Sequence, residues 1–546
     1  MAAVAIVLFL LAAAKVTRAD DRRKQPHIVF ILADDLGWND VSYHGSPQIL
    51  TPNIDALAWN GIRLNRYYTQ PLCTPSRAAF LTGCYPMNTG MQHSVILTTE
   101  PRGLPLHYKL LPQWLGDFGY VSRMLGKWHL GFYKEEYTPT MRGFQSHVGS
   151  WEGFSDYYSH IMDFSWQTWS ISGHDFRRDL QKSKEDDGRY YTHVMTEEAL
   201  KIIKDHPNEK PLFLYIAHLA VHSGNEPEPL KAPTKYTDPY MDIGHPSRTL
   251  YAGMLSVLDE SVGAVFEALG RRGILNETII VLTTDNGAGI TTQFSSFGSG
   301  WPFRGQKGTA WEGGVRVPAL VWSPLFSEHR GAVVESLFHV SDWLPTLYEL
   351  AGGDPSNLSK IDGISQLNTL MHREKLSRTE IVLNIDPIEN VSAIIVYPFK
   401  LMQGDDQGGH YDDWYPFMGN VTRTQNDARE GCEASVVYRV MKHSGFVVTC
   451  GQDPVTYSTS VKCGEKDPTK ACKPIVKPCL FDLSKDPCEY NDISAENIEV
   501  FELLKAKLRK YTASSTPPAN VPADPRGDPA LHNNDFVPWG DADGND

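Results

Sequence analysis

The stretch His27–Ala33, His-Ile-Val-Phe-Ile-Leu-Ala, followed by Asp34-Asp35-Leu36-Gly37, decides the fold of this chain. A continuous run of apolar, partly β-branched residues is typical of a strand buried on both faces of a parallel sheet. Because the run stops at two adjacent acids, it predicts a central strand with Asp34 and Asp35 at its carboxyl end.

The same pattern, a buried strand that leads into polar residues, recurs three times. Thr278–Thr283 leads to Asp285-Asn286-Gly287, Leu212–Ala217 to His218 and His222, and Tyr120–Leu125 to Gly126-Lys127-Trp128-His129. Helical patterns lie between them, such as Leu250, Met254, Leu258, Val262, Val265 and Leu269, closed by Gly270. Strands that alternate with helices predict an α/β fold with a mainly parallel sheet and ligands bound beyond the carboxyl ends of its strands. Any one Asp or His has an ordinary structural alternative, so it is their joint position that indicates a site.

Residues 73–83, Cys-Thr-Pro-Ser-Arg-Ala-Ala-Phe-Leu-Thr-Gly, predict a short helix. Thr74 suits the N-cap, Pro75 the first helical position and Gly83 the end. Cys73 would then precede the helix N-terminus, where the dipole and Arg77 favour negative charge. From the residues alone, Cys73 is a reactive thiol or part of an anion site, with a buried structural cysteine as the alternative.

The segment Cys73-Thr74-Pro75-Ser76-Arg77, continued by Leu81-Thr82-Gly83, resembles the signature C-x-P-S-R-x-x-x-L-T-G of the formylglycine-dependent type I sulfatases. In that family the cysteine is oxidised to formylglycine. Further motifs of the family are Asp34-Asp35, Gly126-Lys127-Trp128-His129-Leu130-Gly131, Asp285-Asn286-Gly287 and Lys307-Gly308-Thr309-Ala310-Trp311-Glu312-Gly313-Gly314. Together they most resemble the arylsulfatase B-like branch, whose relatives include invertebrate enzymes.

This resemblance, closest over residues 26–355, implies an alkaline-phosphatase-like α/β fold. The expected architecture is a large mixed, mostly parallel sheet between helices, with a smaller C-terminal α+β domain that contains an antiparallel sheet. We predict a signal peptide at 1–19, a catalytic domain at 20–385, the smaller domain at 386–512 and a tail rich in Pro and Asp at 513–546.

The resemblance also implies a divalent-cation site formed by Asp34, Asp35, Asp285 and Asn286, with the modified Cys73 close to the metal. Three carboxylates and an amide oxygen are hard ligands that suit calcium or magnesium rather than zinc. Calcium is the usual metal of the family, so we expect Ca²⁺ before Mg²⁺.

The resemblance places the catalytic side chains Arg77, Lys127, His129, His222 and Lys307 around the formylglycine and the sulfate. Lys127, His222 and Lys307 are expected to bind the substrate, because fixed cations stabilise the negative charge that spreads in the transition state. His222 or Lys307 would protonate the leaving alcohol or phenol, and His129 would accept a proton as sulfate is expelled. His218 remains the alternative to His222.

The N-terminus predicts export. Ala2–Ala14 is an apolar run followed by small residues with Lys15 and Arg18, as in a secretory signal peptide, and it is shorter than the ~20 residues of a membrane span. A buried N-terminal helix is the alternative. We expect a secreted or lysosomal protein without a membrane anchor, glycosylated at sequons from the set Asn276, Asn357, Asn390 and Asn420.

The C-terminal part has fewer motifs. Runs at Ala393–Tyr397 and Ser435–Val440 predict strands, and Leu503, Leu504 and Leu508 predict a terminal helix. Phe536 and Trp539 are expected to pin a tail that lies over the surface or is disordered. Six of the eight cysteines lie here and allow fifteen pairings, of which Cys479 with Cys488 would close a plausible short loop. Cys84 is expected to be a buried thiol.

The charge limits the partners. The formal net charge of 51 − 65 = −14 argues against nucleic acid and against anionic membranes as partners. The negative charge favours small or terminal sulfate esters as ligands, held by one cation and local cationic side chains, over long polyanions. Formylglycine-generating enzyme is the partner expected during maturation, and a homo-oligomer is left open.

The substrate stays open between two classes. One is N-acetylgalactosamine 4-sulfate or aryl sulfates, and the other is a small sulfated metabolite such as a glucosinolate, because Ser94–Gly103 lacks the cysteines of the vertebrate arylsulfatase B pattern. The aromatic residues Trp151, Tyr157, Trp301 and Trp311 are pocket candidates, most of which are better explained as core. The alternatives to a sulfatase are a silent binder of sulfated ligands and a phosphatase or phosphodiesterase of the same superfold, expected to use Ser or Thr and two zinc ions.

Overall fold

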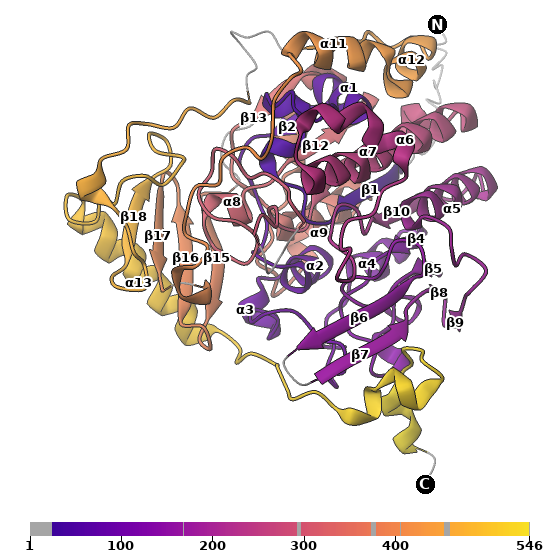
Figure 1. The fold of residues 1–546 in the computed structure, drawn as a ribbon, viewed down its shortest axis with the longest axis horizontal. Helices are drawn as coiled ribbons and strands as arrows, with labels where there is room; N and C mark the ends of the chain where they lie inside the picture. Colours follow the sequence, from indigo (N-terminus) through magenta and orange to yellow (C-terminus); the bar gives the residue numbers. More distant parts are fainter. Residues whose placement is uncertain are drawn as a thin grey trace, which may run out of the picture.

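The computed structural model describes residues 25–166, 169–291, 296–372, 378–404, 406–451 and 459–544. The predicted signal peptide lies outside these residues. Within them a large sheet forms the centre of the molecule (Figure 1). Its strands, in spatial order, are β13(Ala332–Val334), β2(Ile62–Leu64), β12(Ala319–Trp322), β11(Thr278–Thr284), β1(His27–Ala33), β10(Leu212–Ala217), β4(Val121–Gly126), β5(Ser146–Gly149), β8(Arg177–Arg178) and β9(Gln181–Lys182).

The middle of this sheet is parallel. β1 pairs in parallel with β10 on one side and β11 on the other, and β10 continues in parallel to β4 and then β5. β12 runs antiparallel to β11, and β8 and β9 add antiparallel pairs at the far edge. The predicted mixed, mostly parallel sheet is therefore confirmed, and all four strand predictions agree with the structure within one residue at either end.

Helices cover both faces of the sheet, which explains why β1 is apolar throughout. Val29 and Ile31 pack into one core with α1(Pro52–Asn60), α5(Tyr191–Asp205) and α7(Pro246–Arg272). Ile28, Phe30 and Leu32 pack into the other core with α2(Cys73–Thr82), α4(Leu111–Gly116) and α9(Trp343–Leu350). Successive side chains of a strand point to opposite faces, so both faces must be apolar.

Two helix boundaries differ from the predictions. α7 does not close at Gly270 but continues to Arg272, and Gly273 caps it in the left-handed conformation at φ 74°. α2 begins at Cys73 itself with Leu72 as N-cap, so Thr74 is not the cap. The Thr74 hydroxyl instead donates to the carbonyl oxygen of His129 at 2.9 Å, because this helix start is buried against the 127–131 loop. Gly83 ends α2 as predicted, at φ 70°.

A smaller antiparallel sheet lies beside the large one, on the left in Figure 1. Its strands follow in sequence order: β15(Glu380–Asp386), β16(Val391–Val396), β17(Phe399–Gln403) and β18(Cys479–Asp482). The predicted terminal helix is α13(Ile498–Ser514), which buries Leu504 and Leu508 against this sheet while Leu503 is exposed. This confirms the antiparallel C-terminal sheet, whereas the exact domain boundaries stay predictions.

The predicted strand at Ser435–Val440 is wrong, because this segment is the helix α12(Val436–His443). The Ser435 hydroxyl caps it by accepting a hydrogen bond from the backbone N–H of Tyr438, and Val437 and Met441 are buried one turn apart. Spacing of i and i+4 is helical, and it outweighs the β propensity of the valines. α12 and the preceding α11(Gln425–Ala434) pack on α1 and α7 of the large sheet.

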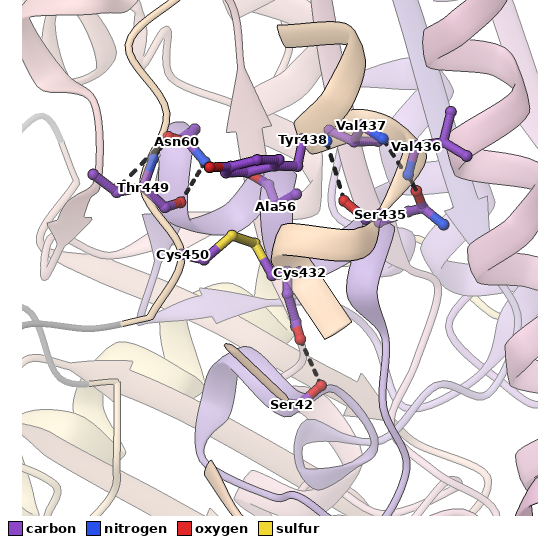
Figure 2. Close-up of a disulfide and its surroundings, with 12 residues drawn as sticks. Ser42, Ala56, Asn60, Cys432, Ser435, Val436, Val437, Tyr438, Thr449 and Cys450 are labelled. Carbon is purple, nitrogen blue, oxygen red and sulfur yellow. Dashed lines mark hydrogen bonds between the residues drawn. A yellow bond between two sulfur atoms is a disulfide. The ribbon is translucent and has the colours of Figure 1, made fainter. Parts of the chain in front are cut away.

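A disulfide cross-links this helix pair to the segment that follows it. Cys432 of α11 bonds to Cys450, and Figure 2 shows this bond between the Asn60–Thr449 pair and the start of α12. The Asn60 side chain donates to the Thr449 carbonyl and accepts from the Thr449 backbone N–H, both at 2.8 Å. The cross-link therefore joins α11 to the segment around Thr449, and hydrogen bonds hold that segment to Asn60 of α1.

The remaining cysteines correct one prediction and confirm another. Cys479 pairs with Cys472 and Cys488 pairs with Cys463, so the predicted Cys479–Cys488 loop is wrong. Both Cys479 and Cys488 are fully buried, and the strand position of Cys479 decides which partner it meets. Cys84 is a free, buried cysteine as expected.

The C-terminal tail crosses the molecule from α13 to the hairpin of β6(Ile161–Trp166) and β7(Trp169–His174), along the bottom of Figure 1. Its residue Asp535 forms a β-bridge with His174 of β7. Phe536 and Trp539 are buried against Phe132, so the predicted anchoring of the tail is confirmed. Among the described residues, no helix is both long enough and apolar enough to cross a membrane.

Candidate active site

The carboxyl ends of β1 and β11 bring together Asp34, Asp35, Asp285 and Asn286, as the strand pattern predicts. All four side chains are buried, with at most 1% of their surface exposed. Asp35 turns away from the strand with φ 61°, and its backbone N–H donates to Asp285 Oδ1 at 3.4 Å. The parallel pairing of β1 and β11 places these ends at one edge of the sheet, so oxygens from two distant segments face one another.

Asp35 lies at the centre of a ring of donors. The Lys307 ammonium contacts both of its carboxylate oxygens, at 2.7 and 2.8 Å, and the Asn286 side-chain amide donates to Oδ1 at 2.7 Å. Burial alone would raise the pKa of Asp35, but Lys307 and then the His222 imidazole hold it well below its usual range. Asp35 is therefore an anion.

One donor to Asp35 was missed at the sequence level. The Ser296 hydroxyl lies 2.9 Å from Asp35 Oδ2 and is buried. It belongs to the loop between β11 and the Lys307 motif, where several serines follow one another, and nothing in that run separates Ser296 from its neighbours. Only the folded loop brings it to the carboxylate.

Asp34 and Asp285 share the cations of the neighbouring elements. The Lys127 ammonium lies 2.5 Å from Asp34 Oδ2, and the Arg77 guanidinium donates to Asp285 Oδ2 at 2.8 and 3.0 Å. Arg77 also donates to the Lys127 carbonyl at 2.8 Å, which ties α2 to the loop after β4. Burial, together with the charge of Asp285, raises the pKa of Asp34 to about 7 in spite of Lys127 and Arg77. The neighbouring cations therefore do not fully compensate the negative charge of Asp34, and a further cation beside it would stabilise the carboxylate.

Cys73 is the first residue of α2, and its thiol lies 3.7 Å from Asp34 Oδ1. The side chain is 2% exposed, and burial raises the pKa of the thiol to about 12 against the opposing effect of Lys127 and Lys307. The expected stabilisation of a thiolate by the helix dipole is thus outweighed by desolvation. Cys73 as it stands is a neutral thiol and a poor nucleophile at neutral pH.

His222 and His129 flank the cluster on two sides. His222 Nε2 faces Asp35 Oδ2 at 3.8 Å, and its Nδ1 lies 2.5 Å from the Ser223 carbonyl oxygen. His129 Nε2 donates to the Ile96 carbonyl at 3.1 Å. Burial lowers the pKa of each imidazole well below the usual value, helped by Lys307 at His222 and by Lys127 at His129. Both rings are therefore neutral at pH 7.

The structure shows that His222, and not the alternative His218, lies at the candidate site. His218 lies fully buried with Nε2 3.3 Å from the Ser261 hydroxyl of α7, in the helix layer rather than at the site. Of the four aromatic pocket candidates, Trp151, Tyr157 and Trp311 have at most 1% of their surface exposed, and they belong to the hydrophobic cores, as expected.

The donor set fits a hard divalent cation. Asp34, Asp35, Cys73 and His222 offer ligand atoms within 4.8 Å of one another. Asn286 Oδ1 is buried and has no hydrogen-bond partner among the described residues, although its amide nitrogen is bonded. A buried carbonyl oxygen without a donor is costly unless a cation meets it. Carboxylate and amide oxygens are what calcium and magnesium prefer.

Comparison with known proteins agrees with this arrangement. The family model described as Sulfatase matches residues 26–353, more than half of the chain. The chain belongs to the sulfatase family. It is 37% identical over 534 residues to arylsulfatase J of Mus musculus, covering 94% of this chain and 80% of that protein. It is also 32% identical to N-acetylgalactosamine-6-sulfatase of Homo sapiens, over 65% of this chain and 67% of that protein. This sulfatase is a sulfuric ester hydrolase.

Solved structures support the fold of this sulfatase. The structure titled Ps i-CgsB in complex with k-i-k-neocarrahexaose superposes with a TM-score of 0.69 at 24% identity, covering 91% of this chain and 94% of that one. Phosphonate monoester hydrolase of Agrobacterium radiobacter superposes with a TM-score of 0.52 at 16% identity, covering 89% and 95%. These likenesses concern the fold, which is the alkaline-phosphatase-like architecture expected from the sequence.

Proposed function

We propose that this sulfatase hydrolyses small or terminal sulfate esters with a formylglycine made from Cys73, beside a calcium ion held by Asp34, Asp35, Asp285 and Asn286. The observation that carries this proposal is the position of Cys73. Its sulfur lies 3.7 Å from Asp34 Oδ1, next to oxygen donors that suit calcium, while its buried thiol cannot itself act as a thiolate at neutral pH.

Calcium and the formylglycine would each supply one kind of chemistry. Calcium would withdraw electron density from the sulfate oxygens, and a hydrated aldehyde supplies two hydroxyls on one carbon, one for attack on sulfur and one for release of sulfate. Asp34, Asp35, Asp285 and the free Oδ1 of Asn286 would hold the cation.

The cationic side chains prepare the site for a sulfate. Lys127, Lys307 and Arg77 are buried and already oriented by Asp34, Asp35 and Asp285. Because their positions are set before substrate arrives, they stabilise developing negative charge without reorganisation. A sulfate monoester carries one charge on its three terminal oxygens, and negative charge also develops on the bridging oxygen as the ester bond breaks, so fixed cations favour the transition state.

In this proposal proton transfer involves the neutral His129 imidazole and the Lys307 ammonium. His129 has an Nδ1 without a hydrogen-bond partner among the described residues, and it is unprotonated at pH 7, so it can accept a proton from the second hydroxyl. His222 and Lys307 both border Asp35, and of these two candidates Lys307 holds a proton at pH 7 and would protonate the leaving oxygen. Lys307 is the charged member of this pair, because Asp35 raises its pKa against the effect of burial.

Export through the secretory pathway is part of the proposal. Three disulfides form among the six C-terminal cysteines, which is typical of an oxidising compartment. The asparagines of all four sequons are exposed, as glycosylation requires. A secreted or lysosomal location would also bring the chain to formylglycine-generating enzyme.

Mass spectrometry of the peptide that contains Cys73, from protein made in cells with formylglycine-generating enzyme, tests the modification. We expect the aldehyde or its hydrate, and a wholly unmodified thiol in active enzyme would overturn the proposal. Cys73→Ala should abolish hydrolysis of nitrocatechol sulfate. Cys84→Ala is the matched control, because Cys84 is the other free, buried cysteine of the described residues and its thiol donates to the Thr82 and Lys360 carbonyls, away from the site. It should keep its activity.

The substrate class needs a direct comparison. Relatives are named arylsulfatases and an N-acetylgalactosamine-6-sulfatase, which supports aryl sulfates and sulfated galactosamine as test compounds. We propose a panel of nitrocatechol sulfate, 4- and 6-sulfated N-acetylgalactosamine disaccharides, a glucosinolate and an intact chondroitin sulfate chain. Preference for the small esters by kcat/KM would support the proposal, and preference for the intact chain would refute it.

A further inference from the structure

A second cluster of metal-binding side chains lies outside the active site, next to the C-terminal tail. It consists of His160, just before β6, His174 at the end of β7, and Asp187 in the loop after β9. Each offers one ligand atom, and these atoms lie within 4.8 Å of one another. We propose that His160, His174 and Asp187 bind a zinc ion that fastens the tail to the body of the enzyme.

The distances suit one ion. Asp187 Oδ1 lies 2.9 Å from His174 Nε2 and 3.7 Å from His160 Nδ1. Two ligands of one tetrahedral zinc ion are roughly 3.3 Å apart, given metal–ligand distances of about 2.0–2.2 Å. The observed values lie on either side of this spacing. Two imidazoles and a carboxylate are ligands that zinc favours, in contrast to the oxygen donors of the active site.

The hydrogen bond of His160 decides which of its nitrogens is free. Nε2 lies 3.2 Å from the Arg189 carbonyl oxygen, so Nε2 carries the proton that this bond needs. The lone pair of the neutral ring is then on Nδ1, which faces the Asp187 carboxylate and has no hydrogen-bond partner among the described residues. Two electron-rich atoms face one another at 3.7 Å, and a cation between them removes that repulsion.

A second proton on His160 is the competing explanation, and the surroundings of the ring oppose it. The side chain is fully buried and stacks on Phe176 with 4.5 Å between the ring centroids, where a charged imidazolium would be costly. The stacking also fixes the ring, so Nδ1 is held toward Asp187. This is a preorganised ligand.

The two acids beside the cluster differ in their partners, and this difference leaves the Asp187 carboxylate available to a metal ion. Its neighbour Asp186 pairs with Arg178 and Arg189, whereas Asp187 has no lysine or arginine partner within the described part of the chain. The Asp187 side chain is 37% exposed, which gives an ion access from solvent and leaves a coordination position for water.

The tail supplies the outer partner of His174. Asp535 Oδ1 lies 4.0 Å from His174 Nδ1, and both atoms are buried without a hydrogen-bond partner among the described residues. Metal-bound histidines commonly direct their other ring N–H at a carboxylate. The backbone N–H of His174 also donates to the Asn534 carbonyl at 2.8 Å, so the tail lies on the residue that would hold the metal. Figure 1 shows this end of the tail beside β7.

The test is zinc binding by the untagged, calcium-saturated enzyme, measured by isothermal titration calorimetry with zinc chloride. We expect about one zinc ion per chain, and Asp187→Asn and His174→Gln should weaken binding by roughly 100-fold or more, since loss of even an outer partner costs 10–100-fold. Asp205→Asn is the matched control, because Asp205 is also an exposed acid and lies at the end of α5. It should bind zinc like the parent.

A second measurement separates this site from the active site. Cobalt bound by two histidines and a carboxylate in tetrahedral geometry absorbs visible light, and this band should be absent in Asp187→Asn. Hydrolysis of nitrocatechol sulfate by that variant should match the parent, and zinc should slow proteolysis of the tail in the parent alone. Failure of the parent to bind zinc at micromolar concentrations, or undiminished binding by both variants, would overturn the proposal.

Discussion

Lys400 is the residue whose replacement should most clearly weaken the contact between the two sheets. It lies on β17 of the smaller sheet, fully buried, with its ammonium 2.9 Å from Glu312 Oε1 and 2.7 Å from Glu489 Oε1. Glu312 begins α8(Glu312–Val315), five residues after Lys307 of the active site. Lys400→Met would remove the cation and leave two carboxylates in the protein interior.

The size of the effect follows from this burial. Removing one partner of a buried ion pair costs about 3–5 kcal/mol, because the remaining charge is uncompensated. Unfolding entropy of about 2.1 cal/mol/K per residue gives roughly 1 kcal/mol/K for a chain of this length. The expected fall in Tm is therefore ~3–5 °C if the chain unfolds as one unit.

Acidic pH should reduce this loss. Burial raises the pKa of Glu489 to about 7 even with Lys400 present. At pH 5 the carboxyl is then mostly protonated in the folded state, so fewer unpaired charges remain in the variant. The difference in Tm between Lys400→Met and the parent should be largest above pH 7 and smaller at pH 5.

Differential scanning calorimetry at pH 5 and pH 7.5 measures this difference. Lys505→Met is the control, because Lys505 pairs with Glu502 at the surface of α13 at 3.3 Å, and such pairs contribute less than about 1 kcal/mol. The double variant Lys400→Met with Glu489→Gln should recover part of the loss. A Tm for Lys400→Met equal to that of the control at pH 7.5 would refute the reasoning.

Three further predictions concern the active site and pH. Lys307→Met should lower kcat for nitrocatechol sulfate by about 10²–10³-fold, as expected for one preorganised cation, while the exposed Lys204→Met should not; equal rates would contradict the role of Lys307. Calcium should raise the Tm of the parent measured after treatment with a chelator, and Asn286→Ala should reduce that rise, which thermal scans with and without calcium chloride can check. Burial raises the pKa of Asp55 to about 8. Because the folded state then holds this proton more tightly than the unfolded chain, the stabilising contribution of Asp55 is complete below about pH 4 and is lost as the pH rises through about 8. Asp55→Asn should flatten that part of the plot of Tm against pH. An unchanged plot would contradict the raised pKa of Asp55.

Much of the active site follows from patterns along the chain. A buried strand must end where polar residues begin, and in a parallel sheet neighbouring strands end at the same edge, so the strand pattern predicts that Asp34, Asp35, Asp285 and Asn286 lie together, as they do. The residues around Cys73 also predict its helix, although the helix begins two residues earlier than expected. Local propensity does not tell which side chain will cap a helix whose start is buried.

Other features depend on contacts between distant segments. Ser435–Val440 reads as a strand from its valines, but it folds as a helix because α1 and α7 offer a surface for Val437 and Met441. The pairing of Cys479 with Cys472 rather than Cys488 depends on the position of β18 in the smaller sheet. In both cases the elements against which the segment packs, α1 and α7 for α12 and β17 for β18, are far away in the sequence.

The sequence by itself determined the α/β class, the carboxylate-rich edge of the sheet and the family, because these depend on residue type and on spacing within single elements. The tertiary structure alone decided that His222 rather than His218 reaches Asp35, that Ser296 joins the site, and that the Cys73 thiol is desolvated. It also brought His160, His174 and Asp187 together beside the tail. Burial, charge pairing and distance arise only when separate segments pack against one another, and these three quantities set the protonation and reach of each side chain.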